Sequence, residues 1–239
     1  MSAQAATFNT RQRAALAALL ITLGACDQRP ASYFPLDPDR YWQYDVVRTT
    51  MDGRKKQKYL IETRAPREWN GMNVQVRQTV DGHQFFYREY ADGISRVARK
   101  LNAEATATAT EPAVLVLPHS PAVGDSWRTQ SHTAVLENTG PPWETLFRIT
   151  QPVELDFTVA STSDTVRVGA GDFSDCLRVV GNGRFSTDVG NYIGRAVISV
   201  SVTEWYAPNV GLVRSERIET TDAQAVSHGS IVMELASYR

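Results

Sequence analysis

Alternation of apolar and polar residues with a period of two is the feature that most limits how this chain can fold. Successive side chains of a β-strand point to opposite faces of a sheet, so the alternation is typical of strands with one buried face. Asp81-Gly82 and Asp92-Gly93 stand between such segments and favour hairpin turns. The first half is therefore predicted to be a meander of antiparallel strands at 41–50, 57–64, 72–80, 84–90 and 94–100.

The second half continues the pattern in more interrupted segments. Pro152 implies a strand edge or a break, because proline cannot donate to a β-ladder. Asn102 to Thr110 could form a loop or a short helix, and no long amphipathic helix is evident after residue 33. Since twist accumulates from strand to strand, we predict a mainly β protein with a single large antiparallel sheet, strongly curved or a half-open barrel. The further strands are expected at 114–117, 126–137, 145–150, 153–160, 165–168, 175–181, 195–205, 211–220 and 230–238.

The first 25 residues have a different character, with no acidic residue and only Arg11 and Arg13 as charges. An apolar run from Ala14 to Gly24 follows them. A basic region before a short apolar region is typical of a helical secretory signal that is later removed. The run is too short for a transmembrane helix, which needs about 20 residues. A buried core helix is the alternative interpretation.

Leu23-Gly24-Ala25-Cys26 resembles the lipobox of bacterial lipoproteins. The resemblance implies cleavage before Cys26, a diacylglyceryl group on its sulfur and acylation of the new amino terminus. Asp27 is similar to the residue that retains enterobacterial lipoproteins in the inner membrane, so this membrane is favoured over the outer one. We therefore expect a signal peptide at 1–25, a lipidated tether at 26–32 and a single β domain at 33–239 that faces the periplasm.

Three further segments stand out: Tyr33–Leu36 with Tyr41–Tyr44, Gly169–Val179 and Trp205–Arg214. They resemble a broad group of uncharacterised bacterial secreted proteins and lipoproteins. The group opens with a YFPL segment and a W.Y pair, and it closes with a WYAPGVGLV-like signature. Asp39 or its neighbours replace the usual glycine before the first tryptophan, and Asn209 replaces the glycine of the closing signature. The sheets of this group are similar to the half-open barrel of the periplasmic lipoprotein carriers LolA and LolB.

Composition and motifs argue against several classes of function. The net charge is −1, and no basic run exceeds Arg54-Lys55-Lys56, so a nucleic-acid partner is not expected. No HExxH, CxxC or GxSxG pattern is present, and Asp37 with Asp39 gives too few oxygens for calcium. We therefore predict no catalytic residue, no metal site and no cofactor. The histidines are scattered along the chain at His83, His119, His132 and His228.

Cys176 is left without an intrachain partner if Cys26 carries lipid. It stands in the strand-like run Cys176–Val180, and a lone thiol in an oxidising compartment is safest when buried. We expect a small core residue here, rather than a reactive nucleophile.

Aromatic residues crowd the first meander, and Phe85-Phe86-Tyr87 must place rings on both faces of its strand. Most of these rings are expected to fill the core, but Phe85, Phe86, Trp42 and Trp205 are candidates for lining a ligand site. The predicted function is that of a non-enzymatic, membrane-anchored lipoprotein that binds an apolar ligand or an envelope protein through its curved sheet. A structural accessory subunit of a cell-envelope complex is the alternative.

Overall fold

The computed structural model describes residues 31–51, 53–140, 145–148, 150–188, 194–223 and 226–239. This part of the chain consists of strands, turns and loops, and it holds no helix able to cross a membrane. The predicted fold class is therefore confirmed for the described residues. The predicted signal peptide, the lipobox, Cys26 and Asp27 lie outside them.

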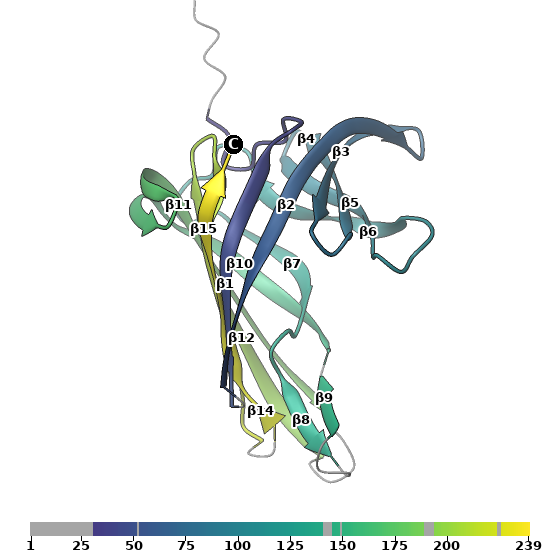
Figure 1. Cartoon of the computed structure of the whole chain (residues 1–239), viewed down its shortest axis with the longest axis vertical. Coiled ribbons are helices and arrows are strands. Elements are labelled where there is room, and N and C mark those ends of the chain that lie inside the picture. Colours follow the sequence, from purple (N-terminus) through teal and green to yellow (C-terminus); the bar gives the residue numbers. More distant parts are fainter. Residues whose placement is uncertain (1–30, 52, 141–144, 149, 189–193, 224–225) are drawn as a thin grey trace, which may run out of the picture.

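One antiparallel sheet of 12 strands forms most of the molecule (Figure 1). Its strand order is β6-β5-β4-β3-β2-β1-β15-β13-β12-β11-β10-β7, and a separate small sheet has the order β14-β8-β9. The large sheet contains β1 (Tyr41–Thr50), β2 (Gly53–Trp69), β3 (Met72–Thr79), β4 (Gln84–Tyr90), β5 (Gly93–Lys100), β6 (Thr108–Pro118), β7 (Ser126–His132), β10 (Pro152–Val168), β11 (Gly171–Asp188), β12 (Arg195–Ala207), β13 (Gly211–Thr221) and β15 (Gly229–Tyr238). The small sheet contains β8 (Glu137–Gly140), β9 (Thr145–Arg148) and β14 (Val226–Ser227).

The large sheet curls until its two edge strands, β6 and β7, approach each other (Figure 1). The pairing of β1 with β15 joins the first strand to the last, with Trp42 opposite Tyr238. β6 pairs with β5 alone and β7 with β10 alone among the described strands. The result is a barrel that is nearly closed, and we call the line along which β6 and β7 face each other without pairing the seam.

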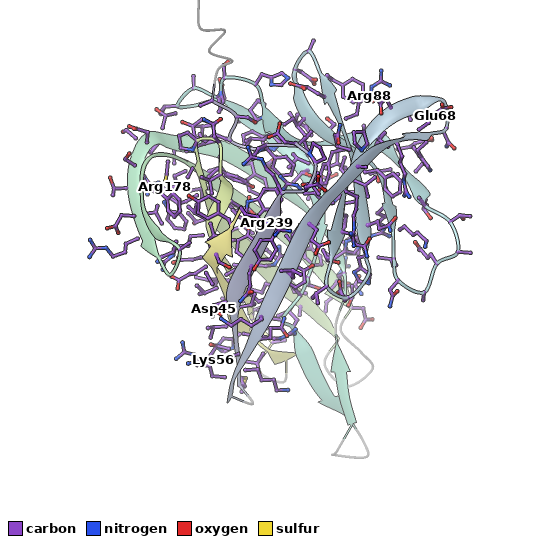
Figure 2. The ribbon with its side chains drawn as sticks, turned by 45° about the horizontal axis from the view of Figure 1, so that its top comes forward. Asp45, Lys56, Glu68, Arg88, Arg178 and Arg239 are labelled. Atoms are coloured by element: carbon purple, nitrogen blue, oxygen red, sulfur yellow. The ribbon has the colours of Figure 1, made fainter. Side chains whose placement is uncertain are left out.

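The concave, or inner, face of the sheet carries most of the core. On β12 the residues Ala196, Ile198, Val200 and Val202 alternate with more exposed neighbours and are all at most 4% exposed. Residues paired across neighbouring strands share a face, so the inner face can be followed along the pairs of the ladder. The largest buried apolar cluster lies on it and draws on β4, β5, β6, β10, β11 and β12. Charged residues such as Asp45 and Lys56 project from the outer face (Figure 2).

Several elements differ from the prediction in length. β10 runs unbroken where the sequence indicated two short strands, 153–160 and 165–168, because bulges at Val159, Ser161 and Asp164 absorb the polar stretch without ending the pairing. β11 extends beyond the predicted 175–181 at both ends, to Gly171 and Asp188. Residues 101–107 form a loop, one of the two predicted alternatives, and β6 begins earlier than expected, at Thr108. Pro152 is the first residue of β10, where a missing N–H costs least.

Candidate functional site

The segment Ala31–Arg40, which we call the entry segment, crosses one end of the barrel. Phe34 is 6% exposed, and its ring packs against Tyr87 with centroids 5.2 Å apart. The guanidinium of Arg77 lies 3.7 Å from the centroid of Phe34 and donates from Nη2 to the carbonyl of Pro35 at 2.9 Å. The entry segment is therefore fixed to the inner face by a cation–π contact and a hydrogen bond from the same side chain.

The opening and closing signatures meet at this end of the barrel. The indole Nε1 of Trp42 donates to the carbonyl of Val210 at 2.7 Å, and the hydroxyl of Tyr44 donates to that of Leu212 at 2.9 Å. Asn209 makes two hydrogen bonds with Ser32 of the entry segment: its backbone N–H donates to the Ser32 carbonyl, and its side-chain oxygen accepts from the Ser32 N–H. The residues of the two signatures therefore stabilise the fold by joining the entry segment and β1 to the turn before β13.

The two residues that replace glycines of the group's signatures both have a left-handed backbone conformation. Asp39 has φ 61° and Asn209 has φ 58°. Asp and Asn adopt this conformation more readily than other residues with a β-carbon, so the replacements leave the turns intact. Position 211 retains the glycine of the group's signature. Gly211 has φ 96°, and a β-carbon there would lie 3.4 Å from Pro35.

A cavity of about 810 Å³ lies between the entry segment, β3 to β5 and the loop after β6. Tyr33, Leu36, Tyr87, Ile94 and Leu117 line it and belong to, or pack against, the largest apolar cluster. Polar residues around it include Gln75, Arg88 and His119, and the imidazole of His119 lies 3.4 Å from the Glu89 carboxylate. The cavity thus joins a polar rim to the apolar inner face.

Several arginines face the inside of the barrel, a pattern that the sequence did not reveal. Arg77 stands opposite Phe85, Arg96 opposite Tyr87 and Arg99 opposite Phe85 from the other side. Burial raises the pKa of Tyr87, and the nearby cations of Arg77 and Arg96 oppose that rise. Period-two alternation predicts which residues share a face, but it does not distinguish an arginine on the inner face from one in solvent.

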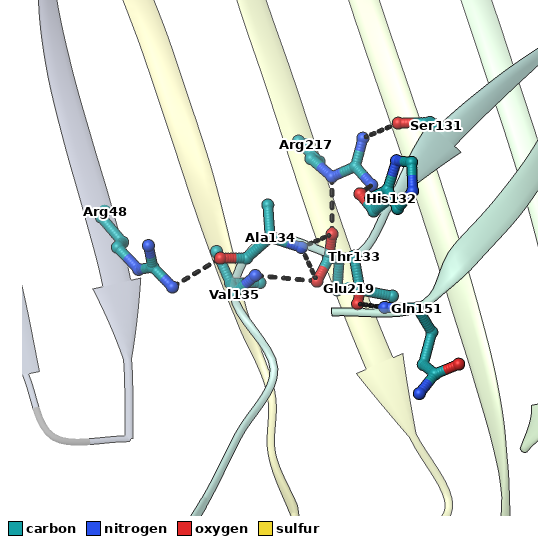
Figure 3. A network of polar contacts seen from close by, with 9 residues as sticks. All are labelled: Arg48, Ser131, His132, Thr133, Ala134, Val135, Gln151, Arg217 and Glu219. Atoms are coloured by element: carbon teal, nitrogen blue, oxygen red, sulfur yellow. Dashed lines mark hydrogen bonds and ion pairs between the residues drawn. The ribbon is translucent and has the colours of Figure 1, made fainter. Parts of the chain in front are cut away.

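Glu219 carries the most buried carboxylate of the described chain, with an exposed fraction of 0%. It accepts from the Ala134 and Val135 amides at 2.8 to 3.0 Å and from Arg217 Nε at 2.6 Å (Figure 3). Arg48 donates to the Ala134 carbonyl from the other side of the same loop. Residues 133–136, which we call the inserted loop, are thereby held against the inner face.

His132 lies beside Arg217 at the base of β7 (Figure 3). Partial burial lowers the pKa of its imidazole, and so do the cations of Arg99, Arg96 and Arg217 in decreasing order. Arg217 Nη2 also donates to the His132 carbonyl at 2.6 Å, so β13 and β7 are in contact here.

The structure separates the candidate ligand-lining residues between faces. Phe85 is partly buried against the inner cluster, whereas Phe86 is 0% exposed and packs with Val74, Val76 and Ala98 on the outer face. Trp42 is buried in a second cluster around β1 and β15. Trp205 is partly buried beside that cluster, and its Nε1 donates to Asp164 at 3.1 Å. Phe85 and Phe86 share β4, two strands from the edge strand β6, and of the two only Phe85 packs against the inner cluster.

The described residues offer no group of three or more histidine, cysteine, aspartate or glutamate side chains able to hold a metal ion. Cys176 is 0% exposed, and burial raises the pKa of its thiol to about 11. A thiol that stays protonated at neutral pH is a poor nucleophile. Its placement agrees with the expected core role.

No family model matches this chain, and no curated protein matches it significantly. Two crystal structures are similar to it in part. One is a Bacteroides fragilis protein described as exported and of YmcC-like fold, with 17% identity, 87% of this chain and 99% of that chain covered, and a TM-score of 0.39. The other is described as a lipoprotein of Parabacteroides distasonis, with 14% identity, 89% and 100% coverage, and a TM-score of 0.38. Similarity at this level says nothing of what this chain binds.

Proposed function

We propose that this protein is exported, anchored at a membrane by lipid on Cys26, and binds an apolar ligand on the inner face of its half-open barrel without chemical conversion. The observation that carries the binding proposal is the position of the largest apolar cluster, which extends to the seam. Val116 of β6 and Trp127 of β7 remain partly exposed at the seam, and Phe85 of β4 does so two strands away.

Barrel width supports the same proposal. A barrel of roughly eight strands is already wide enough to hold one small ligand, and the diameter grows with strand number. The sheet here has 12 strands, and a cavity of about 810 Å³ adjoins its apolar cluster. Volumes of roughly 300 to 1,000 Å³ are typical of small-molecule sites.

A neutral fluorescent probe, N-phenyl-1-naphthylamine, tests the binding proposal. The full chain with Cys26→Ser provides protein free of its own lipid, and saturable fluorescence that oleyl alcohol displaces is the expected result. The matched comparison is Val123→Asp, which places a charge on a side chain that is 65% exposed and outside the cluster. Absence of saturable binding to the folded Cys26→Ser chain would contradict the proposal.

The anchor has its own test. Cys26→Ser removes the thiol that accepts the diacylglyceryl group, so radiolabelled palmitate should enter the wild-type protein and not the variant. Each buried CH₂ contributes about 0.8 kcal/mol of membrane affinity, so the variant should also leave the membrane fraction. Equal labelling of both proteins would refute lipidation at Cys26.

Asp27 is proposed to retain the protein in the inner membrane. Asp27→Ser should then shift the protein towards outer-membrane fractions in a density gradient. Identical profiles before and after the change would remove Asp27 from this role.

The free edges of β6 and β7 favour a second function, docking as an accessory subunit of an envelope complex. An unpaired strand edge presents backbone N–H and C=O groups to which a partner strand can add. Native mass spectrometry of gently purified protein separates the two functions: bound lipid supports ligand binding, and a stoichiometric protein partner supports the subunit.

A further inference from the structure

Three buried polar atoms without a hydrogen-bond partner lie around Tyr87. They are Oε1 of Gln75, Nε of Arg77 and Nε of Arg96. Gln75 and Arg96 stand directly opposite Tyr87 on the two neighbouring strands, and Arg77 lies 5.7 Å from the centroid of its ring. Buried polar atoms normally have partners, so such a group at one place needs an explanation. Gln75 and Tyr87 both line the cavity.

The charges at this place are unbalanced. Within the described part of the chain, Arg77, Arg96 and Arg99 have no carboxylate in ion-pair contact, and Arg77 is only 8% exposed. The acids on this face are engaged elsewhere: Glu219 binds Arg217 and the inserted loop, and Glu204 accepts from Tyr206 at 2.6 Å. A buried cation without an anion is costly, so this region favours a negatively charged group from outside the chain.

Aromatic rings compensate these cations unequally. Arg77 lies 3.7 Å from the ring centroid of Phe34 and 4.6 Å from that of Trp42, distances typical of strong cation–π contacts. Arg96 has a single ring contact, to Phe85 at the longer distance of 5.8 Å. Arg96 is therefore less compensated than Arg77, and it stands opposite Tyr87, which lines the cavity. Arg99 follows on the same strand and is exposed to solvent.

We propose that the inner face binds an anionic amphiphile, whose carboxylate or phosphate head group lies at Arg96, with Arg77 and Arg99 beside it, and whose acyl chain lies along the apolar cluster. This inference rests on the proposed function and names the class of ligand. Ile94 lines the cavity two positions before Arg96, and Phe85 stands opposite Arg99, so apolar and cationic side chains adjoin as an acidic lipid requires.

The test compares oleate with oleyl alcohol, which share an acyl chain and differ in the charge of the head group. Both are titrated calorimetrically and as competitors of N-phenyl-1-naphthylamine on the full Cys26→Ser chain. Oleate should bind about tenfold more tightly than the alcohol, since a charge-assisted hydrogen bond contributes on this scale. Arg96→Gln should remove about tenfold of the oleate affinity and leave that of the alcohol unchanged, and Arg96→Lys should restore part of it.

Arg128→Gln is the matched control, because it removes the same charge from the outer face, where Arg128 pairs with Asp156 at 2.6 Å. It should leave both affinities unchanged. If Arg96→Gln fails to fold, Arg99→Gln replaces it, because that side chain is exposed. The expected loss for oleate with Arg99→Gln is then severalfold, again without effect on the alcohol.

The outcomes separate the two proposals. Equal affinities for oleate and oleyl alcohol, unaffected by Arg96→Gln or Arg99→Gln, overturn the anionic head-group site and leave the apolar site standing. Absence of binding of either ligand to the folded protein overturns both. A preference for 1-oleoyl lysophosphatidic acid over oleate supports the site with a lipid phosphate as its ligand, and the reverse order supports it with a carboxylate.

Discussion

Glu204 and Glu219 lie on the inner faces of neighbouring strands, but their surroundings stabilise the ionised carboxylate to different degrees. Glu219 accepts hydrogen bonds from two amides and from Arg217, which replace the water that it loses on burial. Glu204 accepts one described hydrogen bond, from the Tyr206 hydroxyl. Burial is the largest influence on Glu204 and raises the pKa of its carboxyl, against the opposing effects of Tyr206 and Arg217.

The raised pKa of Glu204 gives a prediction about pH. Between its ordinary pKa of 4.5 and the higher native value, the folded protein binds more protons at this group than the unfolded chain does. The contribution of Glu204 to stability is therefore present below pH 4.5 and is lost as the pH rises through the native pKa. Glu204→Gln should flatten this part of the melting temperature plotted against pH from 4 to 8. Parallel curves for variant and wild type would contradict the assignment.

Phe85 and Phe86 are adjacent in sequence but should respond oppositely to the same substitution. Phe86→Asp places a charge among Val74, Val76 and Ala98 and should lower the free energy of unfolding by at least about 4 kcal/mol. Phe85→Asp changes a partly buried ring at the inner face and should cost less stability while removing binding of the neutral probe. Urea unfolding and probe titration measure the two effects. Equal destabilisation by both substitutions would show that Phe85 belongs to the rigid core.

The entry segment and the turn between β12 and β13 form one structural unit, although they are far apart in the chain. Arg40 Nη1 donates to the carbonyl of Asn209 at 2.7 Å, in addition to the Ser32 contacts of the same asparagine. The pairing of Asn209 with Ser32 gives the asparagine both a conformational and a bonding role.

Substitutions at Asn209 can separate these roles. Asn209→Gly keeps the positive φ accessible and loses the side-chain contact with Ser32, so we expect a cost of a few tenths of a kcal/mol. Asn209→Ala loses the same contact and strains a backbone with φ 58°, and should cost about 1 kcal/mol or more. Thermal unfolding of both variants checks the order. Alanine as stable as glycine would exclude a conformational role for this turn.

Some elements could be predicted to the residue, and others could not. The ranges 41–50 and 84–90 coincide with β1 and β4, because both are rich in aromatic and β-branched residues and are bounded by clear turn residues. β2 extends well beyond the predicted 57–64, to Gly53 and Trp69, since its exposed ends carry polar residues on both faces. Alternation indicates which face of a strand is buried, so it does not predict those parts of a strand that extend beyond the core.

At the scale of the whole molecule, the single curved sheet was predictable but its closure was not. The pairing of β1 with β15 joins residues at opposite ends of the chain, and no local pattern reports such a contact. The curvature of the sheet likewise brings Arg217 of β13 to His132 of β7, where Arg217 Nη2 donates to the His132 carbonyl at 2.6 Å. The sequence identified Phe85 as a candidate, but the arginines around it became visible only in three dimensions.

The seam has a consequence for the motion of the barrel. Neither β6 nor β7 has a ladder partner across it in the described chain, so the two strands can separate without breaking backbone hydrogen bonds between them. β1 and β15 each have a paired strand on both sides and cannot move apart in this way. Local opening of lowest free energy is therefore expected at the seam.

Amide hydrogen exchange measures this local opening directly. Amides of β6 and β7 should exchange faster than those of β1 and β15, and oleate should slow exchange on the seam strands more than elsewhere. Uniform protection around the sheet would mean that the side chains along the seam hold it as firmly as a ladder does. In the expected case the barrel widens at the seam alone, so a ligand can enter from the side while the rest of the sheet keeps its register.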